Sequence, residues 1–381
     1  KNMNILIGAD IVPTSSNIDL FFSGNVQTLL GEELNRILQD SDFRIFNLEV
    51  PLTDLEQPIP KCGPNLIAPT KCIAGYKAMH VDLLTLANNH ILDQDQRGLE
   101  STCQVLDAAG IAYTGVGKTP KEAAKPYIFE CDGKKIGVYA CAEHEFSIVT
   151  KYSSGANPID LLASPDHISF LKAQCDYVIV LYHGGKEYYR YPSPNLQKVC
   201  HKLVEKGADL VVCQHSHCIG CEEKYLGGTI VYGQGNFLFD MSEMDECQTS
   251  LLIKFADGVV SYIPLKKHRE RIRIANSIEK AEILDDFRKR SEEIKDTQLI
   301  EDKYKEFVSQ KLHEYLWGLS GAHDSKILRA INKLSGYRFY RYFLERKYSA
   351  YSTLLILNYL ECEAHREVMI EGLKKCVRKK R

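Results

Sequence analysis

The chain has 381 residues, of which 44% are hydrophobic and 26% charged, and its net charge at pH 7 is -2. This is an ordinary globular composition, long enough for one large domain or for a domain with an appendage. The near-neutral charge excludes a surface built as a whole to hold nucleic acid, and no apolar run reaches the ~18 residues that a membrane-spanning helix needs.

The predicted elements alternate between strands and helices over the first two thirds of the chain. In chain order they are a strand at 4–9, a helix at 26–39, strands at 44–48 and 83–87, a helix at 96–109, strands at 135–141 and 177–182, a helix at 195–205, and strands at 210–213, 229–232, 250–255 and 259–265. Gly110 and Gly207 follow two of the helices, as C-caps do. The alternation predicts a layered α/β fold, and the last strands, which lack helices between them, predict an antiparallel part.

The character of the sequence changes near residue 270. From residue 275 to 381 the pattern shows no convincing strand, and charged helical segments dominate, for example at 278–294 and 304–316. We therefore expect an α/β domain over residues 1–270 and a helical extension over residues 275–381. The apolar spacing of Val308, Leu312 and Leu316 predicts that this extension is packed rather than free.

Cysteine usage and the C-terminal charges bear on location and partners. The 13 cysteines are odd in number and have no framework spacing, which favours a reducing compartment and a cytoplasmic location. The chain begins at Lys1, which leaves an upstream signal or membrane anchor open. Residues 374–381 are rich in Lys and Arg, a pattern typical of a solvated tail or of a contact with an anionic polymer or lipid.

Residues that can bind a metal follow five of the predicted strands. They are Asp10, Glu49, Asn89 with His90, His183, and His215 with His217. The carboxyl ends of strands are where sites form in an open α/β sheet, so we expect these side chains to meet. Imidazole and carboxylate together suit Zn, Mn or Fe rather than Ca. A carboxylate can bridge two such cations, which polarise a phosphoryl or carbonyl oxygen and supply hydroxide near neutral pH.

Seven sequence blocks resemble a known family. They are GAD at 8–10, NLEVPLT at 47–53, LANNHILDQDQRGLEST at 86–102, TGVGKTPKEAAKPYIFECDGKKIGV at 114–138, HGGKEY at 183–188, KGADLVVCQHSH at 206–217 and YGQGNFLFD at 232–240. Their order and number are similar to those of the capsule-biosynthesis CapA family, also called poly-γ-glutamate synthesis proteins, within the calcineurin-like metallophosphoesterases. The resemblance covers roughly residues 4–265 and implies a four-layer α/β/β/α sandwich.

The resemblance also implies a role for each matching residue. Two divalent transition-metal ions (Mn, Zn or Fe) are implied, one held by Asp10 and His217. The other is implied to be held by Asn89, His183 and His215, with Glu49 as the bridge. His90 is the implied general acid and Asp93 its orienting partner, while Glu187 and Asn236 are implied to line the substrate pocket.

Two departures from the family pattern concern the loops around the site. The usual GHHPH reads CQHSH at 213–217, which keeps both spaced histidines. The Gly that usually follows NNHxxD is displaced to Gly98, behind Gln94 and Asp95, which changes the loop next to His90. Neither departure removes a proposed ligand.

Some motifs allow other interpretations. Cys218 and Cys221 form a CxxC that, with His215 and His217 nearby, could mark a structural zinc or a redox pair. Gly115 and Gly117 lack the rest of a dinucleotide fingerprint, and GKT at 117–119 lacks the glycine spacing of a P-loop. A two-metal hydrolytic site remains the prediction.

The resulting functional prediction is a metal-dependent hydrolase, phosphoesterase-like, in capsule or cell-surface polymer metabolism. Two alternatives stand beside it: a non-catalytic polymer-binding accessory of a capsule-synthesis complex, and a metal-dependent amidase on a γ-glutamyl-type polymer. The expected partner is an anionic or polymeric substrate, without nucleic acid. The sequence specifies neither the substrate nor the oligomeric state.

Overall fold

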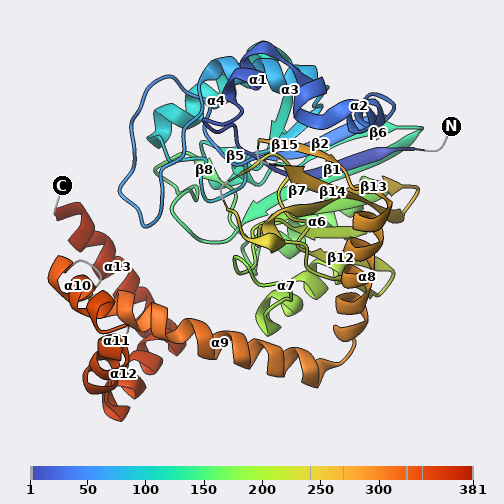
Figure 1. Cartoon of the computed structure of the whole chain (residues 1–381). Coiled ribbons are helices and arrows are strands. Elements are labelled where there is room, and N and C mark those ends of the chain that lie inside the picture. Colours follow the sequence, from blue (N-terminus) through green and yellow to red (C-terminus); the bar gives the residue numbers. More distant parts are fainter. Residues whose placement is uncertain (1–2, 241, 269, 323–324, 337, 380–381) are drawn as a thin grey trace. The chain divides into compact units, whose positions relative to one another are not determined.

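The computed structural model describes residues 3–240, 242–268, 270–322, 325–336 and 338–379 (Figure 1). The chain divides into two compact units, Lys1–Glu301 and Asp302–Arg381. All of the strands among the described residues belong to the first unit, and the last of them ends at Ile274. The predicted helical character of the C-terminal part of the chain is therefore confirmed.

A seven-stranded sheet carries the first strands of the chain. Its order is β15-β14-β13-β1-β2-β3-β4. The strands are β1 (Ile5–Ile11), β2 (Phe43–Leu48), β3 (Leu83–Thr85), β4 (Ala112–Thr114), β13 (Thr249–Ala256), β14 (Val259–His268) and β15 (Arg271–Ile274). Strands β1 to β4 pair in parallel, whereas β13, β14 and β15 add to the edge in antiparallel pairs. The predicted antiparallel part is thus this three-strand meander.

A second sheet has six strands in the order β11-β12-β10-β9-β7-β6. They are β6 (Tyr127–Cys131), β7 (Lys134–Ala142), β9 (Tyr177–His183), β10 (Leu210–Cys213), β11 (Glu222–Tyr225) and β12 (Gly228–Tyr232). Its four central strands are parallel, so their carboxyl ends lie at one edge. A short pair, β5 (Val116–Gly117) with β8 (Gly155–Ala156), stands apart from both sheets.

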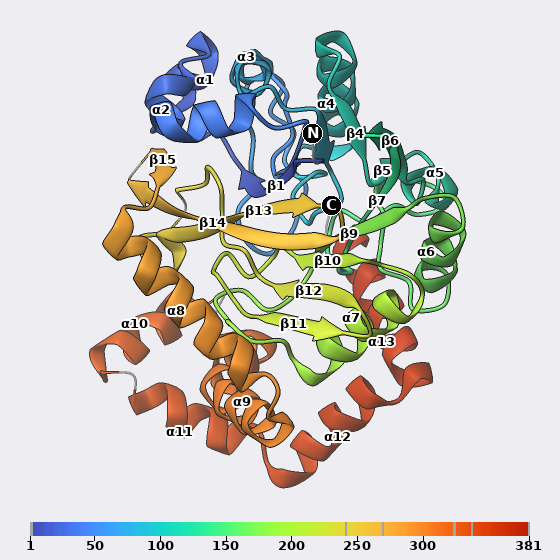
Figure 2. The same ribbon diagram turned by 90° about the vertical axis from the view of Figure 1, so that its right-hand side faces the viewer.

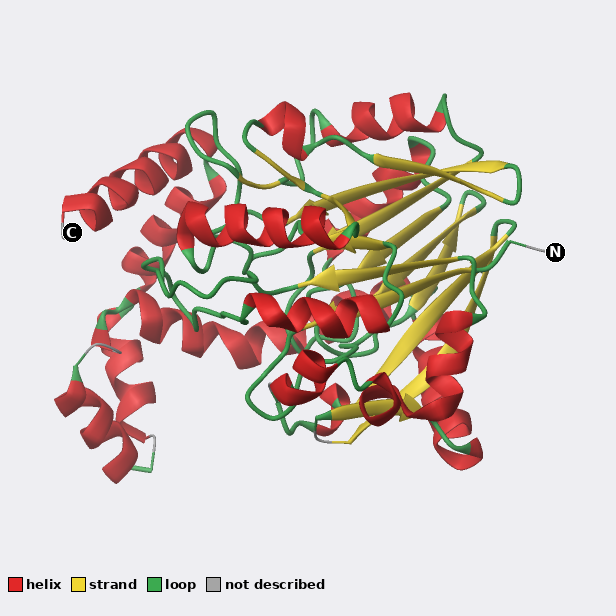
Figure 3. Ribbon diagram, turned by 90° about the horizontal axis from the view of Figure 1, so that it is seen from above, coloured by secondary structure: helices red, strands yellow, loops and turns green. Residues whose placement is uncertain are grey.

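Alternating side chains on the strands define three separate cores. Ile179 on β9 faces a core between the two sheets, where it meets Ile7 of β1, while its neighbour Val180 faces α6 and α7. On β1, Leu6 points to the opposite face, into a core with Leu34 and other residues from the first helices. Because successive strand residues point to opposite faces, this pattern requires helices outside both sheets. The result is the predicted four-layer α/β/β/α sandwich (Figure 3).

The helices of the two outer layers begin and end at recognisable signals. They are α1 (Ile18–Ser23), α2 (Val26–Gln39), α3 (Ile73–Ala78) and α4 (Asp95–Ala109) over the first sheet, α6 (Ser164–Lys172) and α7 (Pro194–Glu205) over the second, and the short α5 (Pro120–Ala123). The side chain of Ser193 accepts a hydrogen bond from the backbone of Leu196 and caps α7, with Pro194 in the first turn. Gly110 adopts a left-handed conformation (φ 68°) and ends α4 as predicted.

Helix α8 (Ser277–Glu293) packs against β14 of the first sheet and β11 of the second (Figure 2). Phe287 fills an apolar cluster with Ile219 and Leu251. The buried Arg290 donates a hydrogen bond from Nε to the carbonyl of Gly220 at 2.7 Å. Residues 277–293 are therefore an integral part of the first unit.

The second unit is built of helices around a small core. Helix α9 (Thr297–Leu319) leads into it, followed by α10 (Lys326–Leu334), α11 (Arg338–Lys347), α12 (Ala350–Glu361) and α13 (Glu363–Lys379). Trp317, Ala322 and Leu344 are buried together at its centre. In the part of the chain that the structure describes, no helix has the length and apolar character to cross a membrane.

Candidate metal centre

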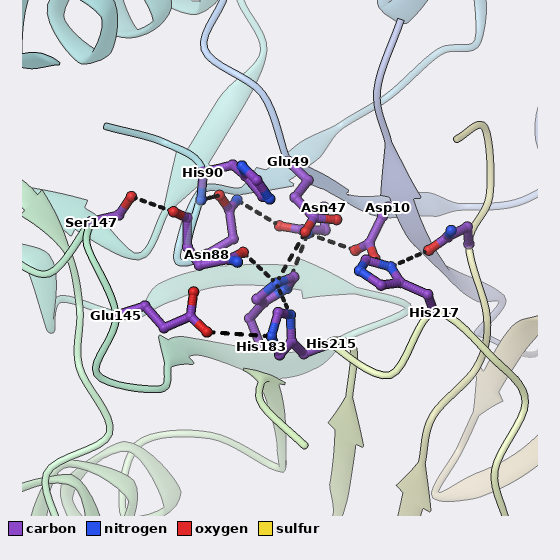
Figure 4. Close-up of polar contacts among 12 residues, drawn as sticks. Asp10, Asn47, Glu49, Asn88, His90, Glu145, Ser147, His183, His215 and His217 are labelled. Atoms are coloured by element: carbon purple, nitrogen blue, oxygen red, sulfur yellow. Dashed lines mark hydrogen bonds and ion pairs between the residues drawn. The ribbon is translucent and has the colours of Figure 1, made fainter. Parts of the chain in front are cut away.

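The predicted ligands come from both sheets and converge at the carboxyl ends of the strands (Figure 4). Asp10 lies near the end of β1, Glu49 follows β2 and Asn89 follows β3, while His183 ends β9 and both His215 and His217 follow β10. Asp10 and Glu49 are fully buried, and the three histidines are at most 5% exposed. The site is therefore a closed polar cluster between the two sheets.

Three ligand atoms surround Nε2 of His183. Nδ1 of His215 lies at 3.0 Å, Oδ1 of Asn89 at 3.1 Å and Oε1 of Glu49 at 3.3 Å. Metal–ligand bonds of about 2.1 Å place neighbouring ligand atoms about 3.0–3.4 Å apart. The three distances to Nε2 of His183 therefore fall in the range expected between ligands of one cation.

Glu49 also connects this group to Asp10 and His217. Two clusters have ligand atoms within 4.8 Å of one another, one formed by Asp10, Glu49 and His183, the other by Glu49, His215 and His217. Oδ2 of Asp10 lies 3.5 Å from Nδ1 of His217. Glu49 belongs to both clusters, which is the position that a bridging carboxylate requires.

Carboxylate oxygens in the cluster lack hydrogen-bond donors. Among the residues that the structure describes, no hydrogen bond reaches Oε1 or Oε2 of Glu49 or Oδ2 of Asp10, although all three atoms are buried. Buried carboxylate oxygens are normally paired or bound to a metal, because leaving them unpaired costs several kcal/mol. The donor set of imidazole nitrogens and carboxylate oxygens fits Zn, Mn or Fe.

The electrostatics of the cluster also favour bound cations. Burial, together with the charge of Asp10, raises the pKa of Glu49 well above its usual range. Burial opposes a charge on His217, but Asp10 and Glu49 outweigh it and raise its pKa to about 9. Burial lowers the pKa of His183 to about 4, which keeps its nitrogen lone pair free to bind a metal. The negative charge of Glu49 is costly at this depth, and a bound metal cation would stabilise it.

A layer of polar side chains holds the ligands in place. Nδ2 of Asn47 donates to Oδ1 of Asp10 at 2.7 Å, and Nδ2 of Asn88 donates to Oδ1 of Asn47 at 3.1 Å. Oε1 of Glu145 lies 3.7 Å from Nε2 of His215, and this contact lowers the pKa of Glu145 to about 2. Such outer contacts fix ring orientation and metal affinity.

The sequence reasoning did not single out these supporting residues. Asn47 and Asn88 lie inside the motifs NLEVPLT and LANNH, each one or two positions from a predicted ligand, so their place in the motif was the available signal. Glu145 lies just beyond β7 in a segment without a distinctive pattern. Glu145 comes close to His215 only through the folding of the strands into sheets.

His90 and Asp93 lie together beside the cluster, with a lysine that the sequence analysis did not identify. Nδ1 of His90 is 2.6 Å from Oδ2 of Asp93, and Nζ of Lys61 is 2.6 Å from the other oxygen and 3.2 Å from Nδ1 of His90. The backbone of Leu66 also donates to Asp93. Burial lowers the pKa of His90, although Asp93 acts in the opposite direction.

The displaced glycine changes how the loop beside His90 is supported. Where the usual motif has Gly, this chain has Gln94, which is 1% exposed. Its side chain accepts a hydrogen bond from the backbone of Gln57 and donates one to the carbonyl of Leu66. Gln94 therefore ties the loop after His90 to the segment that carries Lys61.

The two residues expected to line the pocket lie in different surroundings. Asn236 is fully buried, and its Oδ1 lies 2.8 Å from Nδ1 of His217, so it orients that ring. Glu187 is 38% exposed and forms an ion pair with Lys186 at 3.7 Å. Its place as a substrate contact remains a prediction.

The cysteine motif next to the histidines takes no part in these clusters. Cys218 and Cys221 are buried free thiols. Among the described residues, neither metal-capable group contains a cysteine. The structure therefore brings His215 and His217 together with carboxylates rather than with the CxxC.

Comparison with known proteins identifies the family. Residues 10–241 match the family described as bacterial capsule synthesis protein PGA_cap, and the chain belongs to this family, as the resemblance in the sequence indicated. It is 30% identical over 212 residues to the capsule biosynthesis protein CapA of Bacillus anthracis, covering 53% of this chain and 52% of that protein. With the PGA biosynthesis protein CapA of Bacillus subtilis it shares 29% over 171 residues, covering 43% and 44%. The chain thus spans about half the length of the curated relatives it matches.

Further similarities are weaker. A probable polyglutamine synthesis accessory protein of Mycobacterium tuberculosis is 27% identical over 176 residues, which is 43% of this chain and 46% of that protein. Among solved structures, a hypothetical protein from Thermus thermophilus has a TM-score of 0.43 at 12% identity, covering 70% of this chain and all of that one. A phosphatase from Mycoplasma pneumoniae has a TM-score of 0.41 at 13% identity, covering 71% and 91%.

Proposed function

We propose that this chain is a two-metal hydrolase of the phosphoesterase type that acts in capsule or cell-surface polymer metabolism. The observation that carries this proposal is the shared position of Glu49, whose two buried oxygens lack hydrogen bonds and belong to two adjoining ligand clusters. A purely structural carboxylate at this depth would be paired with hydrogen-bond donors.

Each ligand has a proposed role. Asp10 and His217 hold one cation, and Asn89, His183 and His215 hold the other, with Glu49 between them. When bound, two such cations polarise the scissile group and supply a nucleophile at neutral pH. Asn47, Glu145 and Asn236 keep the ligands in register through the contacts described above.

His90 supplies the proton to the leaving group in this proposal. Its Nδ1 lies against Asp93 and Lys61, so Nε2 is the nitrogen left to face a substrate. Asp93 fixes the ring and favours the protonated form, whereas burial makes that form a stronger acid. A positioned acid of this kind matters most for a poor leaving group.

Membership of this family supports a polymer as the substrate. It also favours a second candidate function. The relatives are named for capsule, PGA and polyglutamine synthesis. A γ-glutamyl polymer, which the resemblance in the sequence implies, is joined by amides rather than phosphoesters. The same ligand cluster could act on an amide carbonyl, so a metal-dependent amidase is the alternative hydrolase. A non-catalytic polymer-binding accessory would need neither His90 nor its partners.

Turnover assays separate these functions. The full chain, loaded with Mn or Zn, is assayed against chromogenic phosphodiesters and against γ-glutamyl peptides, with His215→Ala as the matched inactive variant. Phosphodiester turnover that His215→Ala abolishes supports the phosphoesterase. Turnover of γ-glutamyl peptides alone supports the amidase. A metal-loaded chain that turns over neither substrate supports the accessory role.

A further inference from the structure

Helix α12 is rich in large apolar residues, yet none of its residues is buried. Four large side chains along it are exposed: Tyr351 by 74%, Leu354 by 63%, Leu357 by 45% and Leu360 by 58%. A helix of this length has little stability in water by itself, and a contiguous set of exposed apolar side chains is typical of an interaction site. The exposed surface of α12 therefore requires something to cover it.

Helix α13 follows α12 directly in the chain (Figure 1). It presents an exposed apolar face of its own. Met369, Ile370, Leu373 and Val377 share one face, because their spacing is i, i+1, i+4 and i+8. Their exposed fractions are 43%, 45%, 59% and 53%. Residues 363–377 are all exposed, so α13 does not bury this face against α12.

Positive charge is concentrated next to these apolar faces. Six of the last eight residues, 374–381, are Lys or Arg, and none is acidic. Residues 302–381 contain 17 basic and 9 acidic residues, whereas residues 1–301 contain 31 basic and 41 acidic ones. The net charge is therefore +8 in the second unit and -10 in the first. Such an asymmetry favours an anionic partner for the second unit.

We propose that α12 and α13 bind the surface of a bilayer that contains anionic lipids. A lipid surface offers both features that these helices need: an apolar phase for the leucines and negative headgroups for Lys374, Lys375 and the basic end. Tyr351 and Tyr359 suit the interface, since tyrosine has an apolar body and a polar tip.

Other occupants match only one of the two features. An anionic polymer would neutralise the basic end but leave the leucines of α12 in water. A second copy of the chain could cover the leucines but would bring together two units of charge +8.

Vesicle sedimentation with the full chain tests the proposal. We expect binding to vesicles made of phosphatidylglycerol and phosphatidylcholine in equal parts, and little binding to phosphatidylcholine alone. Reversal of two charges with Lys374→Glu and Lys375→Glu should reduce the partition coefficient by about tenfold or more, since each basic residue near such a surface contributes measurably. Leu354→Gln with Leu357→Gln should reduce it by a similar factor.

Matched control variants test whether vesicle binding depends on α12 and α13 or on exposed charges and exposed apolar residues anywhere in the chain. Lys118→Glu with Lys121→Glu reverses two exposed charges in the first unit, and Leu162→Gln removes a leucine that is 87% exposed there. Both controls should bind vesicles as the unchanged chain does, and circular dichroism should show equal helix content in every variant. Absence of binding to anionic vesicles would overturn the proposal. A dimer that Leu354→Gln dissociates, without lipid binding, would overturn it in favour of a second copy.

Discussion

Oδ2 of Asp93 lies 2.6 Å from Nδ1 of His90, and the side chain of Asp93 is fully buried. The opposite oxygen of Asp93 is 2.6 Å from Nζ of Lys61, whose side chain is also buried. The carboxylate is therefore held from two sides and cannot turn without breaking one contact. His90 is fixed in the same way that an acid–base residue is oriented by its partner.

The first prediction concerns the role of His90. His90→Ala should keep its metals but lose turnover by about 10²–10⁴, the range for a lost general acid. The loss should be smallest for a substrate with a good leaving group, which needs no proton. Asp93→Asn should show a milder defect with the same dependence on leaving group. Rates on a series of aryl phosphodiesters, with metal content measured in parallel, check both. Full activity of His90→Ala on a poor leaving group would contradict the assignment.

The second prediction is the metal content. Protein purified without chelators should contain more than one equivalent of transition metal by elemental analysis. His215→Ala should lower that content, whereas His201→Ala should not, since His201 pairs with Glu223 away from the cluster. Less than half an equivalent in the unchanged chain, with none regained on adding Mn, Fe or Zn, would count against a metal centre.

The third prediction concerns the support of Asp10. Asn47→Leu keeps the volume at a site that is 1% exposed but removes the hydrogen bond to Asp10. Metal affinity should fall by about 10–100-fold, as is typical when such a supporting contact is lost. Chelator competition measures the change. Thr102→Val is the control, because Thr102 is buried and hydrogen-bonded to Leu52 away from the ligands. An equal loss in both variants would mean a general loss of stability.

The positions of most strands along the chain, and of the metal-capable residues that follow them, could be predicted because both are local properties. Apolar runs of 4–8 residues mark buried strands, and a polar residue after such a run lies at its carboxyl end. Asp10, Glu49 and His183 were found in this way. The structure adds that these residues belong to two facing sheets. Positions along the sequence do not tell which strands share a sheet.

What the sequence analysis missed depends on tertiary contact. Lys61 lies in a segment without regular structure, 29 residues before His90, and only the loop held by Gln94 brings the two together. Short strands were missed for a related reason. Strand β4 has three residues, and β11 has only polar or half-buried positions, so neither carries an apolar run. Strands β4 and β11 are recognised only by their pairing with neighbouring strands.

The fourth prediction uses the pH dependence of stability. Lys267 is 6% exposed and donates to the carbonyl of Phe239, and burial lowers its pKa to about 8. The unfolded chain, with an ordinary lysine, binds more protons than the folded chain between about pH 8 and 10, so folding gains stability as pH rises through that window. The free energy of unfolding should therefore rise by up to about 3 kcal/mol relative to Lys267→Met between pH 7 and 10.

Denaturant unfolding of both proteins at pH 7 and 10 measures this difference. Comparing the two proteins at each pH cancels other groups that titrate in the same range. Lys266→Met is the control for removal of a positive charge, because Lys266 is the half-buried neighbour on the same strand. A gap between the unchanged chain and Lys267→Met that stays constant with pH would show that burial does not disfavour the charge at Lys267.

The last prediction concerns the place of α8 in the first unit. Phe287 is 4% exposed and lies with its ring centroid 4.8 Å from that of Tyr262, edge to face. Phe287→Ala should lower the free energy of unfolding of the first unit by about 3–5 kcal/mol, the usual cost of such a cavity. Ile278→Ala, on the same helix but 73% exposed, should change it by less than about 0.5 kcal/mol. Urea unfolding followed by far-UV circular dichroism compares the two, because the single tryptophan, Trp317, lies in the second unit. If both variants unfold at the same midpoint, α8 does not stabilise the sandwich.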